Sequence, residues 1–216
     1  MSGRALRDTP TRFVPRDERD QVFVAFAKLV ARQGYGDVDV DAVAAAAGIS
    51  RATFDEWFDG LDDCMLGALE ATADQAFVVA ADAFVRTPGD WAEAVHAMLA
   101  ELLHFLAASP ELTRICTVEA LEAGAVVLER LDELISRFTD FLEPGYAVAE
   151  QPPPAITAEA ISGGMFELIR SHAIGGRIAA LPEALPTATV IALSPFVGSD
   201  EAERIARRPG AAPADG

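Results

Sequence analysis

Side chains that could take part in catalysis or bind a metal are few in this sequence, and no catalytic constellation stands out among them. The two cysteines, Cys64 and Cys116, are far apart, so they form neither a disulfide framework nor the ligand spacing of a zinc site. His96 and His104 would lie on roughly one face of a helix with Glu101 between them. A metal or acid–base site is one interpretation of that pair, and ordinary packing or surface histidines are the other. Because the sequence also lacks a glycine-rich phosphate loop and a nucleophile elbow, we predict no enzyme, no metal and no cofactor.

A different chemistry is indicated by the stretch GISRATFDEWF, from Gly48 to Phe58. Ser50 is a good N-cap for a short helix. Arg51 is the one cation of that helix and stands near its N-terminus, where side chains of a DNA-reading helix reach the edges of bases. Asp55 and Glu56 give the same helix two carboxylates, which a polyanion would repel.

The segments before this stretch are those that would position such a helix. Apolar residues recur at helical spacing and alternating β-type runs are nearly absent from the sequence, so we predict an all-α protein. A first helix is expected from about Arg16 to Gln33, and a second, DVDAVAAAA, follows the N-cap Asp39 and ends at Gly48. Small alanines allow two helices to cross closely, and glycine takes the turn without steric cost. This is the layout of a helix-turn-helix, although a helix–glycine–helix corner is also a general packing device.

Several short motifs follow one another without a gap in the first third of the chain. They are Gly34-Tyr35, Val40, Val43-Ala44, AAGIS at Ala46 to Ser50, ATF at Ala52 to Phe54, Phe58, and LDDCMLGALE leading into a long helix. With these motifs, the stretch from Arg16 to Leu69 resembles the DNA-binding domain of the TetR family of transcriptional regulators. More loosely, GGRIAALPEALP and IALSPFVGSDEA near the C-terminus are similar to the end of one branch of that family.

The resemblance implies an N-terminal three-helix helix-turn-helix domain, followed by a helical domain that binds a small effector and dimerises. We expect a flexible arginine-rich arm over residues 1–15, the DNA-binding domain over 16–61, the effector-binding and dimerisation domain over 62–208, and a disordered tail over 209–216. Contacts to a double-stranded DNA operator are expected from the second helix of the motif and from the arm, because basic arms can enter a minor groove. The candidate DNA-binding residues are Ser50, Arg51, Ala52, Thr53, Trp57, Arg4, Arg7 and Arg12.

Three residues depart from the family pattern at positions that commonly touch phosphate. Asp39 stands where a Ser or Thr usually caps the helix, Asp55 where a tyrosine is usual, and Leu61 where a lysine is usual. From Arg16 to Glu70 there are five basic residues against twelve acidic ones, and the neutralisation of phosphates depends on Lys and Arg. The sequence therefore predicts few phosphate contacts.

The helices expected between residues 62 and 141 are rich in Ala, Met and aromatic side chains. Most of these residues should simply be core, but a bundle of this kind can also leave an apolar cavity between its helices, where ligands bind. We predict a small apolar effector with one or two polar groups, which would meet His104, Arg114 or Glu119. The candidate ligand-binding residues are Trp91, Met98, His104, Phe105, Arg114, Cys116 and Glu119.

Two C-terminal segments have the composition of an interface. ISGGMFELI contains glycines where two helices could approach closely, and ATVIALSPF is too apolar to face water alone. We predict a two-fold homodimer through these segments, whereas the alternative is that they only close the core of the monomer. The candidate interface residues are Ile161, Gly164, Met165, Leu168, Val190, Leu193 and Phe196.

The formal charge of −17, from 34 acidic and 17 basic residues, argues against general affinity for nucleic acid or anionic membranes. No apolar run reaches the ~18 residues of a membrane span, and the N-terminus lacks the apolar region of a secretory signal. We therefore predict a cytoplasmic protein with no membrane partner. The leading hypothesis is a ligand-responsive transcriptional regulator, a homodimeric repressor released from DNA by a small apolar effector. The alternative is a TetR-fold protein that has lost DNA binding and acts as a small-molecule sensor or protein-interaction module.

Overall fold

The computed structural model describes residues 11–208, and every regular element in that range is a helix. The predicted all-α class is therefore confirmed. The α-helices are α1 (Glu18–Gln33), α2 (Val40–Ala47), α3 (Arg51–Trp57), α4 (Leu61–Arg86), α5 (Trp91–Ala107), α6 (Pro110–Thr117), α7 (Ala125–Ser136), α8 (Gly145–Val148), α9 (Thr157–Ile174), α10 (Leu185–Val197) and α11 (Ser199–Ala206). Short 3-10 helices are η1 (Tyr35–Asp37), η2 (Glu119–Leu121), η3 (Arg137–Phe141) and η4 (Ile178–Ala184).

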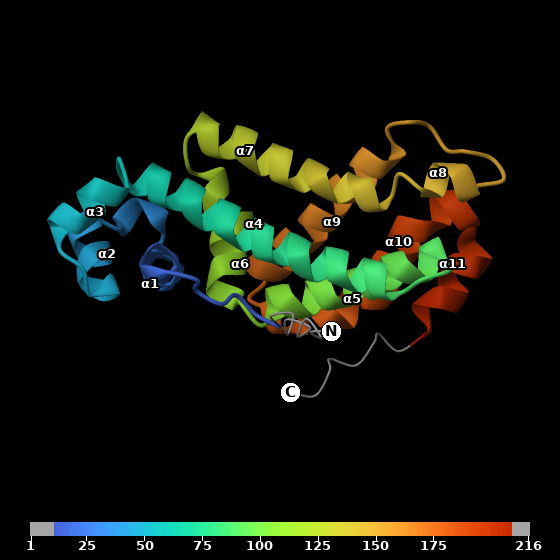
Figure 1. Ribbon diagram of the computed structural model, residues 1–216, viewed down its shortest axis with the longest axis horizontal. Helices are drawn as coiled ribbons and strands as arrows, with labels where there is room; N and C mark the ends of the chain where they lie inside the picture. The colour runs from blue at the N-terminus through green and yellow to red at the C-terminus, as the bar shows by residue number, and fades with distance from the viewer. Residues whose placement is uncertain (1–10, 209–216) are drawn as a thin grey trace, which may run out of the picture.

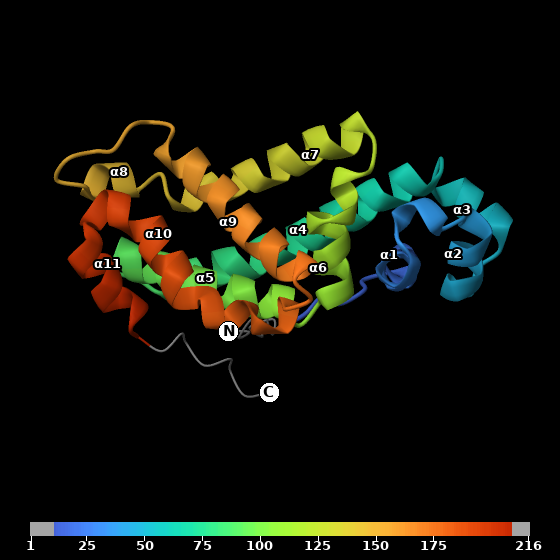
Figure 2. The same cartoon turned by 180° about the vertical axis from the view of Figure 1, so that it is seen from behind.

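The helices form an elongated molecule with a small three-helix unit at one end (Figure 1). This unit consists of α1, α2 and α3, and α4 leads out of it along the rest of the molecule. In the larger part, α5, α6 and α7 pack against α4, while α9, α10 and α11 are seen from the near side in Figure 2. Because α6 packs against both α1 and α4, it connects the three-helix unit to the larger part.

The corner between α2 and α3 forms by the local contacts that the sequence predicts. The Asp39 carboxylate accepts the backbone N–H of Ala42 at 2.7 Å, and Ser50 Oγ accepts that of Thr53 at 3.0 Å. These bonds satisfy N–H groups that the first turn of a helix leaves without a partner. Gly48 ends α2 with a φ of 74°, a left-handed conformation that glycine adopts without strain.

The three-helix unit has its own aromatic core, which fixes the orientation of α3. The ring of Phe58 lies 5.0 Å from that of Phe54 and 5.8 Å from that of Phe23, measured between centroids. The remaining large side chains of this core are wholly or almost wholly buried: Val22, Phe26, Val30 and Val43. Phe54 and Phe58 are one helical turn apart and face inward, so the opposite side of α3 is left for solvent or a partner.

The chain before α1 is held against the larger part of the molecule. Phe13 is buried, and its backbone N–H donates to Ser109 Oγ at 2.8 Å. The backbone N–H and carbonyl of Val14 both bond to the side-chain amide of Gln75, each at 2.9 Å. The expectation of a flexible arm up to residue 15 is therefore wrong for residues 13 and 14, because side chains of distant segments bind their backbone. The predicted tail over 209–216 lies outside the described residues.

Two segments, Leu61–Arg86 and Ile178–Val197, are long and apolar enough to cross a membrane by length and composition. The sequence prediction that no segment reaches this limit is therefore wrong. Both segments pack against other helices, and 56% of the apolar window in the first is buried inside the protein. Their composition therefore also fits helices that face the core of a bundle.

Candidate nucleic-acid interface and apolar cavity

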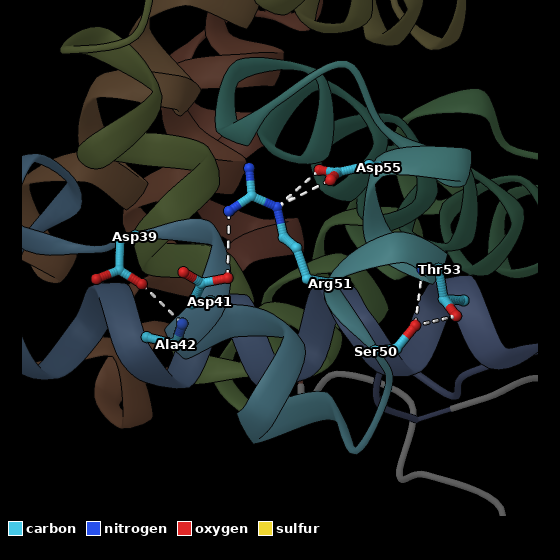
Figure 3. Close-up of polar contacts among 7 residues, drawn as sticks. All are labelled: Asp39, Asp41, Ala42, Ser50, Arg51, Thr53 and Asp55. Carbon is cyan, nitrogen blue, oxygen red and sulfur yellow. Dashed lines mark hydrogen bonds and ion pairs between the residues drawn. The ribbon is translucent and has the colours of Figure 1, made fainter.

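The helix α3 carries its polar side chains on the open side of the three-helix unit (Figure 3). Ser50, Arg51 and Ala52 are exposed, and Thr53 and Trp57 are half-buried. Ser50 Oγ also lies 2.8 Å from Thr53 Oγ1, so the hydroxyls of the cap and of the first turn are linked. An exposed first turn on a helix at the end of a molecule is what insertion into a major groove requires.

Two carboxylates hold the guanidinium of Arg51 (Figure 3). Its Nε donates to both oxygens of Asp55, at 2.9 and 3.0 Å, and its Nη1 donates to Asp41 on α2 at 3.2 Å. These bonds, with that of Asp55 as the larger contribution, raise the pKa of Arg51. All three side chains are more than half exposed, and ion pairs in that setting are weak. Arg51 can therefore exchange its partners for a base or a phosphate, but both carboxylates stay beside the contact.

Two other cations in or next to the three-helix unit, Arg16 and Arg19, contact groups of the protein itself. Arg16 Nε donates to Asp20 at 2.9 Å. Arg19 donates to the backbone carbonyl of Trp57, and its guanidinium lies 5.0 Å from the ring centroid of Phe58. These contacts of Arg19 tie α1 to the end of α3 and leave fewer cations for phosphate.

The predicted basic arm is only partly within the described residues. Arg4 and Arg7 lie outside them. Arg12 is exposed, and the next two residues, Phe13 and Val14, are bound by Ser109 and Gln75 of the larger part of the molecule. Arg12 therefore belongs to a segment bound to the larger part of the molecule and not to the surface around α3. The side chain that does lie beside Arg51 is Asp41 of α2, which was not singled out from the sequence.

An apolar cavity of about 140 Å³, partly open to the surface, lies in the larger part of the molecule. Its walls come from α4, α5, α6, α7 and α9, with Phe138 of η3, Leu142 and Ala192 of α10. Of the predicted ligand-binding residues, Met98 and Cys116 line it. Burial raises the pKa of the Cys116 thiol to about 12, so this cysteine is a neutral lining group and not a nucleophile.

The polar residues in the lining of this cavity were not predicted from the sequence. Thr72 on α4 and Ser162 on α9 both line it, and each is nearly fully buried. Neither hydroxyl has a hydrogen-bond partner among residues 11–208 by ordinary geometry, and Thr72 has only the Cys116 thiol beside it, which is a weak partner. Hydroxyls within helices often bond to the carbonyl one turn earlier, so nothing in the sequence marks these two as unusual.

Comparisons with known proteins identify the fold. No protein-family profile matches the sequence, and no curated protein matches it. The fatty acid degradation regulator FadR from Bacillus halodurans superposes with a TM-score of 0.70 at 15% identity, covering 86% of this chain and 98% of that chain. FadR from Bacillus subtilis, solved in complex with stearoyl-CoA, gives 0.68 at 15% identity over 82% and 97%. A TetR family transcription regulator from Marinobacter aquaeolei VT8 gives 0.58 at 20% identity over 80% and 95%.

This chain has the TetR-family fold. The resemblance predicted from the motifs between Arg16 and Leu69 is therefore confirmed at the level of structure, over most of the chain and not only its N-terminal part. The three solved structures named above are transcriptional regulators.

Five of the predicted ligand-binding residues do not line the cavity of this TetR-fold chain. Trp91 packs on Phe196 with ring centroids 5.3 Å apart, Phe105 is wholly buried in the core, and His104 bonds to the backbone of its own helix. Arg114 and Glu119 pair with each other. The prediction did not separate these five from the cavity lining, because apolar and polar residues at helical spacing fit the core or a surface pair equally well.

Arg114 and Glu119 belong to the junction with the three-helix unit. Arg114 Nη2 lies 2.9 Å from Glu119 Oε1, and Glu119 Oε2 accepts the backbone N–H of Tyr35 at 3.4 Å. The Tyr35 hydroxyl in turn donates to Asp62 at the start of α4. Hydrogen bonds therefore connect the end of α6 to the segment that leads from α1 into α2.

The predicted interface residues fall into two groups. Ile161, Leu193 and Phe196 are buried within the monomer, so these three side chains belong to its core. Met165 is half-buried and lines the cavity together with Ile161. Gly164 is exposed, and Leu168 and Val190 are half-buried on the same two helices. Because α10 is apolar over most of its length, its sequence alone does not show which side packs inside the monomer.

His96 and His104 do not form a site in the TetR-fold bundle. His96 is buried, with Nδ1 2.8 Å from Thr189 Oγ1, and burial lowers its pKa. No group of three His, Cys, Asp or Glu side chains in the described part of the chain is arranged to hold a metal ion.

Proposed function

We propose that this chain is a ligand-responsive transcriptional regulator, a homodimeric repressor that leaves its operator when a small apolar effector binds. The observation that carries the proposal is the combination, in one TetR-fold molecule, of an exposed capped helix with a cation at one end and an apolar cavity in the larger part. In this proposal residues 16–61 bind DNA, and residues 62–208 bind the effector and dimerise. The protein would act in the cytoplasm without a membrane partner.

The route from effector to DNA would pass through α6. Cys116 and Thr117, at its C-terminal end, line the cavity, and Glu119 just beyond it contacts Tyr35. α6 also packs against α1. An effector that binds better to one position of α6 would therefore favour one orientation of the three-helix unit. In a dimer this changes the spacing of the two α3 helices, which must match half-sites about one helical turn of DNA apart. The structure of FadR from Bacillus subtilis in complex with stearoyl-CoA supports the proposal that a protein of this fold binds a small molecule.

The proposed dimer surface is the face formed by α9 and α10, which is turned to the viewer in Figure 2. Gly163 and Gly164 are exposed in the middle of α9, and Ile174 and Ile191 are large apolar side chains with 55% and 42% of their surface exposed. Small residues beside exposed apolar ones allow close contact between helices of two copies, which buries the apolar surface.

Replacing Gly164 by tryptophan should weaken dimerisation roughly tenfold or more, because the new side chain would separate helices that need close contact. The monomer itself can accept the change, since a Cβ at this position meets no described atom within 4 Å. Sedimentation equilibrium of the two proteins measures the effect, with Gly164→Ala as the small-residue control that should remain dimeric. A monomeric natural protein at micromolar concentration, or an unchanged Gly164→Trp dimer, would rule out this surface.

The second candidate function is a sensor or interaction module that keeps the fold and does not bind DNA. The observation that favours it is the pairing of Arg51 with Asp41 and Asp55, which puts two negative charges where DNA would lie. The two functions differ in their affinity for duplex DNA of random sequence.

Binding to random duplex DNA, measured by fluorescence anisotropy from low to moderate salt, separates the two functions. We expect weak binding and a shallow salt dependence, with about two to four phosphates neutralised per subunit and a slope of about −0.9 for each. Changing Asp55 to Tyr together with Leu61 to Lys should strengthen binding and steepen the slope. Asp82→Tyr with Val85→Lys makes the same change in charge near the other end of α4 and serves as the matched control.

Tight binding of the natural protein with a steep slope would contradict the role given to the carboxylates. If the natural protein binds no duplex even at low salt, while Asp55→Tyr with Leu61→Lys does bind, the sensor or interaction module becomes the better assignment.

A further inference from the structure

The cavity contains hydrogen-bonding capacity that the protein does not use. The residues Thr72 of α4 and Ser162 of α9 line it, and they are only 3% and 5% exposed. Among the described residues neither has a regular hydrogen-bond partner. Thr117, in the same lining, donates its hydroxyl to the carbonyl of Thr113 at 2.7 Å. Because buried hydroxyls are normally paired, Thr72 and Ser162 are the two groups that a ligand in this cavity would satisfy.

The cavity also offers no charge to balance an ionised ligand. Within residues 11–208, its lining includes no Asp, Glu, Lys, Arg or His. Arg114 and Glu119 lie outside this lining; they pair with each other, and Glu119 accepts the backbone N–H of Tyr35 at the junction. A carboxylate or phosphate entering the cavity would lose its water without gaining a cation, and burial of an unpaired charge is strongly unfavourable.

The volume limits the part of the ligand that is enclosed. At about 140 Å³, the cavity is close to an engineered apolar cavity of about 150 Å³ that binds benzene. The enclosed body is therefore about the size of one six-membered ring or a short branched chain.

From these three properties we infer that the effector is an electrically neutral molecule with a compact apolar body and a hydroxyl or carbonyl group, bound by Thr72 and Ser162. This inference rests on the proposed function and names the chemical class of its effector. It excludes free carboxylates and phosphate-bearing molecules whose charged group must enter the cavity.

Three benzenes with a single substituent, phenol, toluene and benzoate, test the inference with the full-length protein in the absence of DNA. Each is titrated at neutral pH while the melting temperature is followed, since a ligand that binds the folded state raises it by mass action. Phenol should bind roughly three- to tenfold more tightly than toluene because of one additional hydrogen bond. Benzoate should give no shift.

Variants of the lining assign the effect to the two hydroxyls. Thr72→Val and Ser162→Ala should each reduce the preference for phenol over toluene, and the double variant should remove it while keeping the binding of toluene. Thr117→Val is the matched control, because its hydroxyl is already bonded to a carbonyl, and the preference should persist. Thr72→Ser keeps a hydroxyl and should also retain it.

Several results would overturn the inference: equal binding of phenol and toluene, binding of benzoate as tight as that of phenol, no binding of any probe, or a preference that survives the double variant. These results concern the ligand class only and would leave DNA binding by α3 untouched. A failure of the proposed function would give a different result. The protein would then bind phenol with the expected preference over toluene but would recognise no DNA.

Discussion

Replacing Arg51 by alanine should abolish sequence-specific DNA binding and leave the melting temperature nearly unchanged. Arg51 is the one cation of α3, and a well-placed contact of this kind to a base discriminates by roughly tenfold to a hundredfold. A dimer would lose two such contacts. Stability should hardly change, because the side chain is 53% exposed and loses only exposed ion pairs to Asp41 and Asp55.

The control for this prediction is Arg86→Ala. Arg86 is 56% exposed and pairs with Asp82 at 2.9 Å within one helical turn, as Arg51 does with Asp55, but it lies at the end of α4 away from α3. Specific binding, measured by mobility shift with an operator and an unrelated duplex, should survive Arg86→Ala. Specific binding that also survives Arg51→Ala would show that α3 does not read DNA through this residue.

Replacing Phe58 by alanine should lower the free energy of unfolding by roughly 3–5 kcal/mol, the cost of removing a large aromatic side chain from a core. Phe58 is 4% exposed and contacts the rings of Phe23 and Phe54, and the guanidinium of Arg19 lies over it. Its loss would leave a cavity between α1 and α3, so the helix proposed to read DNA would also lose its orientation.

Urea unfolding at one fixed protein concentration measures this effect, because a dimer's stability depends on concentration. Phe58→Leu keeps most of the volume and should cost less than about 1.5 kcal/mol. An equally small loss for Phe58→Ala would mean that α3 is positioned by contacts other than its aromatic core.

Features that depend on neighbouring residues in the chain could be predicted from the sequence. Asp39 and Ser50 cap their helices through N–H groups three residues ahead, and Gly48 ends α2 by its own conformation. The helical spacing of Phe54 and Phe58 likewise determines which side of α3 is buried. The helix-turn-helix was predictable because each of these effects acts within one or two helical turns.

Features that depend on the packing of distant segments could not be predicted in the same way. Thr72 and Ser162 come from α4 and α9, and only the folded bundle brings both to one cavity. Leu193 and Phe196 lie on a helix that is apolar nearly all round, so their sequence does not distinguish a monomer core from an interface. The partner of Arg51 on α2, Asp41, also becomes a neighbour only when the corner is formed.

The most direct test of the central claim is a selection of binding sites from random duplex DNA with the full-length protein. We predict enrichment of a sequence with two-fold symmetry, because a homodimer would present two α3 helices related by its symmetry. The same selection with Arg51→Ala should enrich nothing. A natural protein that is folded and dimeric, and still enriches no sequence at low salt, would contradict the claim that this chain regulates transcription by binding an operator.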